Sequence, residues 1–185
     1  KTCDAIIHLA AENRPKSEDA FKKINVDFTA QITKALIKLN RKIPIVFASS
    51  TQVSLGNPYG KSKLQAERLL SELSNSNGNP VAIMRLTNVF GKFCLPNYNS
   101  VVATFCYNIA NSLPIEVHKP EKVLRLVYID DVVDDILKKL SSKLFSYEIF
   151  ECQKVHEVKL KELAQIIKSF ADGDYTENAY AVGSG

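Results

Sequence analysis

Short apolar runs and longer amphipathic stretches alternate along this chain, and their order predicts its secondary structure. The runs at residues 43–48 (IPIVFA) and 81–86 (VAIMRL) are rich in apolar and β-branched residues without regular polar alternation, as expected of strands buried on both faces of a parallel sheet. A similar run at 5–10 (AIIHLA) predicts another strand. Helical periodicity fills 12–44 and resumes at 58. Strands that alternate with helices indicate an α/β protein.

Apolar residues at three- and four-residue steps mark the helices. The stripe between 12 and 44 is predicted to pack into the core and consists of Ile24, Phe28, Ile32, Ala35, Leu36 and Leu39. A second helix begins at Pro58, a residue that suits a first helical turn, and carries Leu64, Leu69, Leu70 and Leu73. The turn-forming residues at 74–80 (SNSNGNP) predict a loop after it.

The second half of the chain is less regular. Residues 87–99 form a long stretch without periodicity, 123–129 predict a strand, and a helix is expected to begin at Asp130 and Asp131. The apolar stripe of a last amphipathic helix consists of Val158, Leu160, Leu163, Ile166, Ile167 and Phe170. No periodicity follows from residue 171 onward, which predicts an irregular tail.

Hydroxyl groups and a Tyr-x-x-x-Lys pair lie where a strand gives way to a helix. Ser49 and Ser50 end the apolar run, and Tyr59 and Lys63 open the next helix on one face. A free phenol has a pKa of about 10, which a cation within about 4–6 Å lowers, and Lys63 is expected to be that cation. Ser50 is expected to orient the substrate oxygen. This set suits proton and hydride transfer at a carbonyl or alcohol.

The spacing of the pair is a weak signal by itself, because roughly one Tyr-x-x-x-Lys is expected by chance in a chain of this composition. Its context is more specific. A buried strand, hydroxyls at the end of that strand and a helix that starts with the pair occur together here. That combination favours an active site over a surface coincidence.

Composition narrows the classes of protein further. The chain has 185 residues, of which 45% are hydrophobic and 24% charged, as is usual for one globular domain. No apolar run reaches the length of about 18 residues that a membrane span needs. The four cysteines show no C-x-x-C spacing, so no metal site is expected, and scattered thiols predict a cytoplasmic protein. A net charge of +4 spread along the chain does not predict nucleic acid binding.

Several of these segments together resemble the extended short-chain dehydrogenase/reductases that act on nucleotide sugars, the NAD-dependent epimerase/dehydratase family. The resemblance lies in residues 8–11 (HLAA), 25–29 (NVDFT), 47–53 (FASSTQV), 59–63 (YGKSK) and 85–91 (RLTNVFG). It covers roughly residues 1–170 and keeps the order of the family's motifs. It implies a Rossmann-like doubly wound parallel sheet with a small C-terminal substrate-binding part, and NADP or NAD as cofactor.

A narrower resemblance is to two-domain enzymes of capsule and O-antigen synthesis, the CapF (WbjC) type. It lies in residues 57–60 (NPYG), 96–101 (PNYNSV), 103–107 (ATFCY) and 128–131 (YIDD). It implies NADPH-dependent reduction of a 4-keto UDP-N-acetyl-dideoxyhexose, a homodimer, and a cupin domain in the full-length protein. The UDP-sugar is then the expected partner.

The resemblance also implies roles for individual residues. The catalytic residues are expected to be Ser50, Tyr59 and Lys63. Those that bind the cofactor are expected to be Leu9, Ala10, Ala11, Asn25, Ser49, Tyr59, Lys63 and Leu86. Those that bind the substrate are expected to be Asn88, Asn99, Ser100 and Arg125.

Several of these residues have a plainer interpretation. Asn25 is as well explained as an ordinary polar residue of a helix, and Asn99 as a helix cap. Asp130 and Asp131 are interpreted as residues of a helix amino end rather than as catalysts. His8 is interpreted as a buried histidine whose hydrogen bonds are satisfied. Arg125 lies one residue out of step with the family's arginine, which in a strand means the opposite face.

The family usually begins with a glycine-rich turn that binds the cofactor's pyrophosphate. The seven glycines of this chain form no G-x-x-G-x-x-G, so we expect a fragment that lacks roughly the first three strands. The resemblance divides the chain into the C-terminal portion of the dinucleotide-binding domain at 1–90, a mainly substrate-binding part at 91–170, and the tail at 171–185.

Two alternatives to the reductase stay open. A nucleotide-sugar 4-epimerase uses the same three catalytic residues, and a non-catalytic dinucleotide-binding sensor needs no hydride donor. A 4,6-dehydratase is disfavoured, because Thr51 and Gln52 occupy the places of the Asp-Glu pair that such enzymes need. No exposed apolar pattern favours a bare interaction domain.

Overall fold

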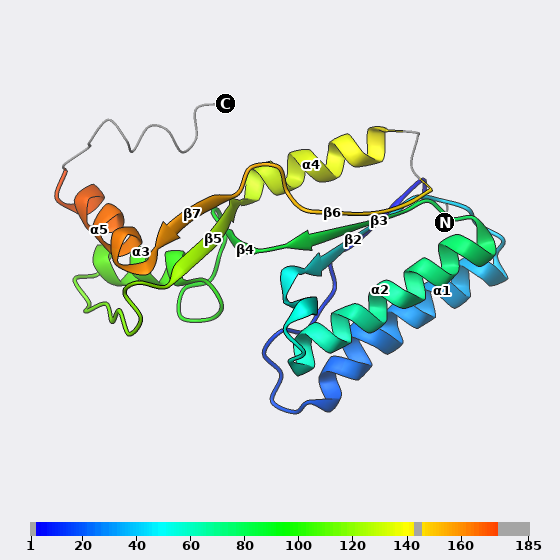
Figure 1. Ribbon diagram of the computed structural model, residues 1–185, viewed down its shortest axis with the longest axis horizontal. Coiled ribbons are helices and arrows are strands. Elements are labelled where there is room, and N and C mark those ends of the chain that lie inside the picture. The colour runs from blue at the N-terminus through cyan, green and yellow to red at the C-terminus, as the bar shows by residue number, and fades with distance from the viewer. Residues whose placement is uncertain (1–2, 143–145, 174–185) are drawn as a thin grey trace. The chain divides into compact units, whose positions relative to one another are not determined.

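The computed structural model describes residues 3–142 and 146–173, and its chain folds as two compact units (Figure 1). Unit 1 comprises Lys1–Thr87 and Asp131–Gln153, and unit 2 comprises Asn88–Asp130 and Lys154–Gly185. The expected functional division at 1–90 and 91–170 stays a prediction, and the two units differ from it in that 131–153 return to unit 1, where strand β6 pairs with β3. Most of the expected tail lies outside the described residues.

Unit 1 contains a four-stranded parallel sheet in the order β1-β2-β3-β6. Its strands are β1 (Ile6–His8), β2 (Ile45–Ser50), β3 (Val81–Leu86) and β6 (Tyr147–Phe150). The π-helix η1 (Phe21–Asp27) and α1 (Phe28–Lys38) link β1 to β2, and η2 (Thr51–Ser54) and α2 (Pro58–Asn77) link β2 to β3. Figure 1 shows α1 and α2 on one side of the sheet and α4 (Ile129–Ser141) on the other. The predicted parallel α/β sheet is thus confirmed.

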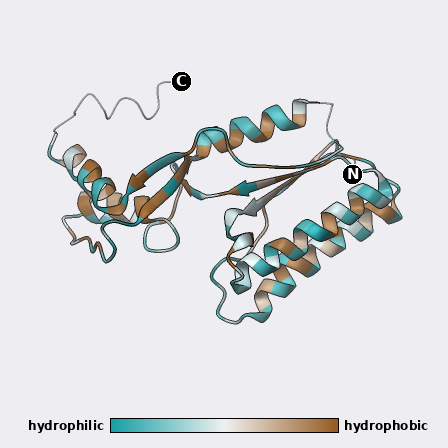
Figure 2. Cartoon of the chain, viewed as in Figure 1, coloured by the Kyte–Doolittle hydropathy of each residue, from teal (hydrophilic) through white to brown (hydrophobic). Residues whose placement is uncertain are grey.

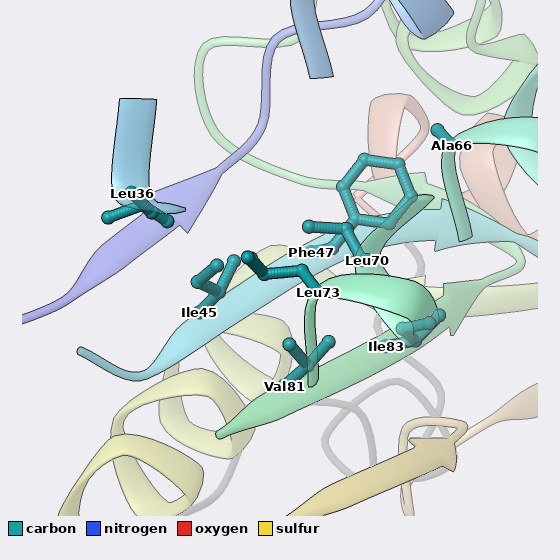
Figure 3. Packing of buried hydrophobic residues seen from close by; sticks show 8 residues of the cluster. All are labelled: Leu36, Ile45, Phe47, Ala66, Leu70, Leu73, Val81 and Ile83. Carbon is teal, nitrogen blue, oxygen red and sulfur yellow. The ribbon is translucent and has the colours of Figure 1, made fainter. Parts of the chain in front are cut away.

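The core of unit 1 lies between the sheet and α1 and α2. Its buried side chains come from α1, α2, β2 and β3 and are Leu36, Ile45, Phe47, Ala66, Leu70, Leu73, Val81 and Ile83 (Figure 3). Burial of apolar area on this scale is the main force that holds the helices to the strands. The strands predicted at 43–48 and 81–86 therefore form the centre of the sheet.

The predicted core face of the first helix is largely wrong. Ile24, Phe28 and Leu39 are exposed, and only Leu36 and Ile32 of the predicted stripe pack into the core. The other buried residues of this face are polar and are Asn25, Thr29 and Thr33. The polar members of this buried face bond to the backbone or to other buried groups, which offsets the cost of their desolvation. Figure 2 accordingly shows both hydrophobic and hydrophilic residues on the visible faces of α1 and α2.

The helix α2 is longer than predicted. It begins as expected, with Pro58 in the first turn and the Asn57 side chain accepting a hydrogen bond from the Gly60 amide at 2.7 Å. It then continues to Asn77 through the predicted loop. Gly78 ends it in the left-handed conformation, where glycine has no steric penalty, and its amide bonds to the Ser74 carbonyl.

Unit 2 contains a three-stranded mixed sheet in the order β4-β5-β7. Strand β4 (Asn88–Phe90) is parallel to β5 (Val123–Tyr128), and β7 (His156–Lys159) is antiparallel to β5. Helices α3 (Val101–Ala110) and α5 (Leu160–Ala171) cover an apolar core that includes Phe105, Leu126 and Leu163.

Three elements of this half differ from the prediction. The stretch predicted to be irregular contains β4, and Val158 belongs to β7 rather than to the last helix. Ile129 begins α4 rather than ending the strand before it. Short strands such as β4 have too few residues to show a period in the sequence.

No helix in the part of the chain that the structure describes is long and apolar enough to cross a membrane.

Gly60 is a position where α2 closely approaches η2. A Cβ at this residue would lie 2.1 Å from the backbone oxygen of Gln52. We predict that Gly60→Ala lowers the free energy of unfolding by about 1–3 kcal/mol, because the two segments must separate. Urea unfolding of the purified protein measures this, with the exposed neighbour Lys61→Ala as control, expected within about 0.5 kcal/mol of the parent. Equal midpoints for the two variants would contradict the prediction.

Candidate active site

The candidate site is built around the carboxyl end of β2 in unit 1. Ser49 and Ser50 are its last two residues, and both are buried. Ser50 pairs in register with Leu86, the last residue of β3, so two strand ends meet here. The Ser50 hydroxyl accepts a hydrogen bond from the Gln52 amide at 3.2 Å and so caps η2. Ligands of open parallel sheets bind at such carboxyl ends.

Tyr59 lies in the first turn of α2 and faces this strand end. Ser50 is the side chain whose hydrogen bonding acts on the pKa of Tyr59, and the expected role of Ser50 toward the substrate oxygen stays a prediction. The pKa of Tyr59 is nevertheless raised above its usual value of 10.0, because burial disfavours the phenolate more than the bond to Ser50 favours it. The net shift is thus opposite in direction to the expected one, and the role of Lys63 toward Tyr59 stays a prediction. The neutral phenol is the resting form.

Lys63 is buried, with 1% of its side chain exposed. Its ammonium donates a hydrogen bond to the Ala48 carbonyl at 2.6 Å and lies 4.1 Å from the centroid of the Phe47 ring. Burial lowers the pKa of Lys63 to about 8, and the Glu67 carboxylate opposes that shift. A charged amine held here is oriented by the strand backbone and by a ring face that attracts cations.

Asn25 fixes the backbone around this pair. It is 1% exposed, and its side-chain oxygen accepts from the Glu12 amide at 2.7 Å while its nitrogen donates to the Glu12 carbonyl at 2.9 Å. The same nitrogen donates to Ser62 at 2.9 Å, and Ser62 donates to the Tyr59 carbonyl at 2.7 Å. One amide thus joins the segment after β1 to the first turns of α2, which an ordinary surface asparagine would not do.

His8 is a buried histidine with a satisfied hydrogen bond, as predicted. The hydroxyl of Thr29 donates to the Asn25 carbonyl at 2.8 Å, so it accepts from His8 Nε2 at 2.9 Å. The ring therefore carries its proton on Nε2. Burial first, and then the charge of Lys63, lower the pKa of His8 to about 4, so the ring is neutral at physiological pH.

The residues expected to bind the cofactor gather at the same edge of the sheet. Leu9, Ala10 and Ala11 follow β1 directly and are exposed, and the small side chains of Ala10 and Ala11 leave the backbone open to a flat ligand. The ammonium of Lys63 uses one of its three hydrogen-bond donors on the strand. These features fit a dinucleotide cofactor, and Ser49 is the exception, since its hydroxyl donates to Glu67 instead.

The residues expected to bind the substrate all lie in unit 2. The Asn88 side chain donates to the Arg125 carbonyl at 2.9 Å, which brings these two residues together on adjacent strands. Ser100, rather than Asn99, caps α3, because its hydroxyl accepts from the Ala103 amide at 3.3 Å. Asn99 is exposed one residue before the cap.

Arg125 is exposed on β5, whose neighbours Leu124 and Leu126 are buried on the other face. Its Nε lies 3.6 Å from Glu157. Asp130, in the first turn of α4, pairs with Lys92 at 2.8 Å, which agrees with a residue of a helix amino end. The substrate roles of the unit 2 residues stay predictions.

Two features of the structure were missed by sequence reasoning. Unit 2 holds an open, largely apolar cavity of about 470 Å³ between the segment that follows β4 and α3, lined by residues that include Phe93, Cys94 and Cys106. In unit 1, Glu67 is buried between Ser49 and Arg85. The i, i+4 spacing of Lys63 and Glu67 on one helix was the available signal for the second feature.

Comparisons with known proteins agree with this geometry. The sequence profile of the NAD dependent epimerase/dehydratase family matches residues 1–152. The chain is 39% identical over 185 residues to a UDP-2-acetamido-2,6-beta-L-arabino-hexul-4-ose reductase of Pseudomonas aeruginosa strain PA103, covering all of this chain and 50% of that protein. It is 28% identical over 123 residues to a dTDP-L-rhamnose 4-epimerase of Burkholderia thailandensis, and that match covers 65% of this chain and 34% of the epimerase.

A solved structure is similar as well. The capsular polysaccharide assembling protein CapF of Staphylococcus aureus superposes with a TM-score of 0.78 at 35% identity, covering 92% of this chain and 45% of that one. The chain thus spans half or less of the length of these relatives. Because the family's profile matches most of its residues, and the sheet and strand-end site are those that the match implies, this chain belongs to the NAD dependent epimerase/dehydratase family.

Proposed function

We propose that the protein reduces the 4-keto group of a UDP-N-acetyl-dideoxyhexose with NADH or NADPH. The observation that carries this proposal is the placement of Ser50, Tyr59 and Lys63 at one strand end, with the phenol of Tyr59 neutral. A neutral phenol is a proton donor, which is what the reduction of a ketone requires. The reductase of Pseudomonas aeruginosa supports the substrate class.

In the proposed reaction Tyr59 donates its proton to the keto oxygen of the sugar, and Ser50 holds that oxygen by a hydrogen bond. The nicotinamide cofactor, when bound, supplies the hydride that completes the alcohol. Burial of Ser50 and Lys63 excludes water from the inner side of the site and strengthens the interactions of their polar groups. After the proton leaves, the ammonium of Lys63 stabilises the tyrosinate charge.

Lys63 is proposed to bind the ribose of the cofactor as well as to stabilise this charge. The bond to the Ala48 carbonyl orients its ammonium and leaves two further N–H groups for ligands. Leu9, Ala10, Ala11, Asn25, Ser49 and Leu86 are proposed to form or support the cofactor site. Ser49 is proposed to support the cofactor site with its backbone rather than its side chain, since its hydroxyl donates a hydrogen bond to Glu67.

Asn88, Asn99, Ser100 and Arg125 are proposed to contact the nucleotide sugar. We also infer a role in capsule or O-antigen synthesis, since the similar Staphylococcus aureus protein is described as assembling capsular polysaccharide. A homodimer, an additional cupin domain and a cytoplasmic location belong to the same proposal, and the scattered thiols agree with a reducing compartment.

A 4-epimerase is the second candidate, because the chain is also similar to a dTDP-L-rhamnose 4-epimerase. An epimerase must first remove a proton from the sugar hydroxyl, so its tyrosine has to act as a base. The raised pKa of Tyr59 favours the opposite role in this structure. Net consumption of NADPH separates the two activities, because an epimerase regenerates its cofactor in each turnover.

We predict that Tyr59→Phe lowers kcat for NADPH-dependent reduction of a 4-keto UDP-N-acetyl-dideoxyhexose by about a thousandfold, because the proton donor is lost. The decrease of NADPH absorbance with the complete protein measures this. Tyr147→Phe is the matched control, since Tyr147 begins β6 at the opposite end of the sheet from Ser50, and it is expected to keep full activity.

An intact protein that binds NADPH but consumes none would contradict the reductase. Interconversion of the 4-epimers of a UDP-sugar under those conditions would then establish the epimerase, and its absence would support the sensor.

We predict a second signature in the pH dependence of kcat/KM. The pKa of Lys63 is lowered to about 8, so the ammonium is present below that pH and is lost as the pH rises through it. Activity is therefore expected to fall above about pH 8. Lys63→Arg keeps the charge at all these pH values and is expected to remove the alkaline fall, whereas Lys63→Met is expected to be poorly active throughout. The same alkaline fall in Lys63→Arg would assign it to another group.

A further inference from the structure

Glu67 is a buried carboxylate that the proposed reaction does not use. It lies on α2, one helical turn beyond Lys63, and is 3% exposed. Its Oε1 accepts hydrogen bonds from the Ser49 hydroxyl at 2.5 Å and from Arg85 Nε at 3.1 Å, and its Oε2 accepts from Arg85 Nη2 at 2.7 Å. Both carboxylate oxygens are therefore bonded.

The two partners of Glu67 are themselves paired. Ser49 on β2 and Arg85 on β3 stand opposite each other in the sheet, one residue before the Ser50 and Leu86 pair at the strand ends. One carboxylate thus joins α2, which carries Tyr59 and Lys63, to the two strands that carry Ser50 and Leu86. A shift of α2 along the sheet would break three hydrogen bonds at once.

A need for stability alone does not account for a charge at this position. A buried ion pair holds a fold together little better than apolar side chains of the same volume, because both charges must be desolvated. A carboxylate supplies something that apolar side chains lack, which is a negative charge beside Lys63. Burial works against the ammonium of Lys63, and the charge of Glu67 is the influence that opposes it.

The other charged groups around this pair do not replace Glu67. From β1, His8 is neutral, and from β3, Arg85 adds positive charge. Tyr59 on α2 has a neutral phenol, and Tyr147 and Glu151 act on Arg85. The charged residues of η1 and α1 are all exposed to solvent and are Lys22, Lys23, Asp27, Lys34 and Lys38.

We propose that Glu67 is a positioning residue of this site, which fixes α2 on the ends of β2 and β3 and keeps the ammonium of Lys63 charged. Its catalytic consequence rests on the proposed reductase function. Its effect on Lys63 does not, because the protonation of a lysine can be measured without turnover.

Glu67→Gln in the complete protein tests this, because glutamine keeps the shape of the side chain and removes its charge. Titration of the lysine side chains by NMR follows Lys63, whose signal is identified by its loss in Lys63→Arg. The midpoint, near 8 in the parent, is expected at lower pH in Glu67→Gln. In the activity assay, kcat/KM is expected to fall roughly fivefold or more at pH ~8.5 and less than about twofold at pH ~6.5.

Glu72→Gln is the matched control. Glu72 is exposed on the same helix, so its substitution is expected to leave the Lys63 midpoint and the activity unchanged. If Glu67→Gln does not fold, the double variant Glu67→Gln/Arg85→Met carries the test, because it leaves neither charge buried without its partner. Its Lys63 midpoint is expected to lie below that of the single variant Arg85→Met, from which it differs only in the charge of residue 67.

The proposal would be overturned by a Lys63 midpoint in Glu67→Gln within about 0.3 pH unit of the parent, or by one in the double variant within the same range of Arg85→Met. An inactive parent protein would count against the reductase function only, since the Lys63 midpoint still decides the role of Glu67.

Discussion

The burial of one ammonium group is the constraint on which the rest of unit 1 depends. Lys63 reaches the sheet beneath the carboxyl ends of β2 and β3, where an unpaired charge would be costly. The Ala48 carbonyl, the Phe47 ring and the Glu67 carboxylate each offset part of that cost. Together they hold the lysine in one orientation and leave its charge sensitive to pH. That combination agrees with the proposed role of Lys63, which is to stabilise a tyrosinate during catalysis.

The buried polar face of η1 and α1 follows from the same requirement. Tyr59 and Lys63 have to stay in fixed places relative to the strand ends, and Asn25 achieves this through Glu12 and Ser62. A polar side chain in this position gives a directional bond, which an apolar one cannot give. Hydrogen bonds therefore position the site, while the apolar cluster below it supplies most of the stability.

The evidence for function has two parts that support different statements. Membership of the NAD dependent epimerase/dehydratase family rests on the profile match and on the strand-end site of unit 1. The choice of a reductase over an epimerase rests on the neutral phenol of Tyr59 and on the similarity to the Pseudomonas aeruginosa enzyme. The proposed substrate residues lie in unit 2, where the pairing of Asn88 with Arg125 gives mutagenesis a defined starting point.

The sequence by itself determined the central strands, the start of α2 and the Ser50, Tyr59 and Lys63 set, because apolar runs, caps and an i, i+4 spacing are local patterns. Only the tertiary structure decided which face of α1 is buried, since polar residues there bond to groups that are distant along the chain. The role of Glu67 and the raised pKa of Tyr59 depend in the same way on burial by other elements. A sequence pattern records what a residue is, but burial and partners arise only when separate segments pack together.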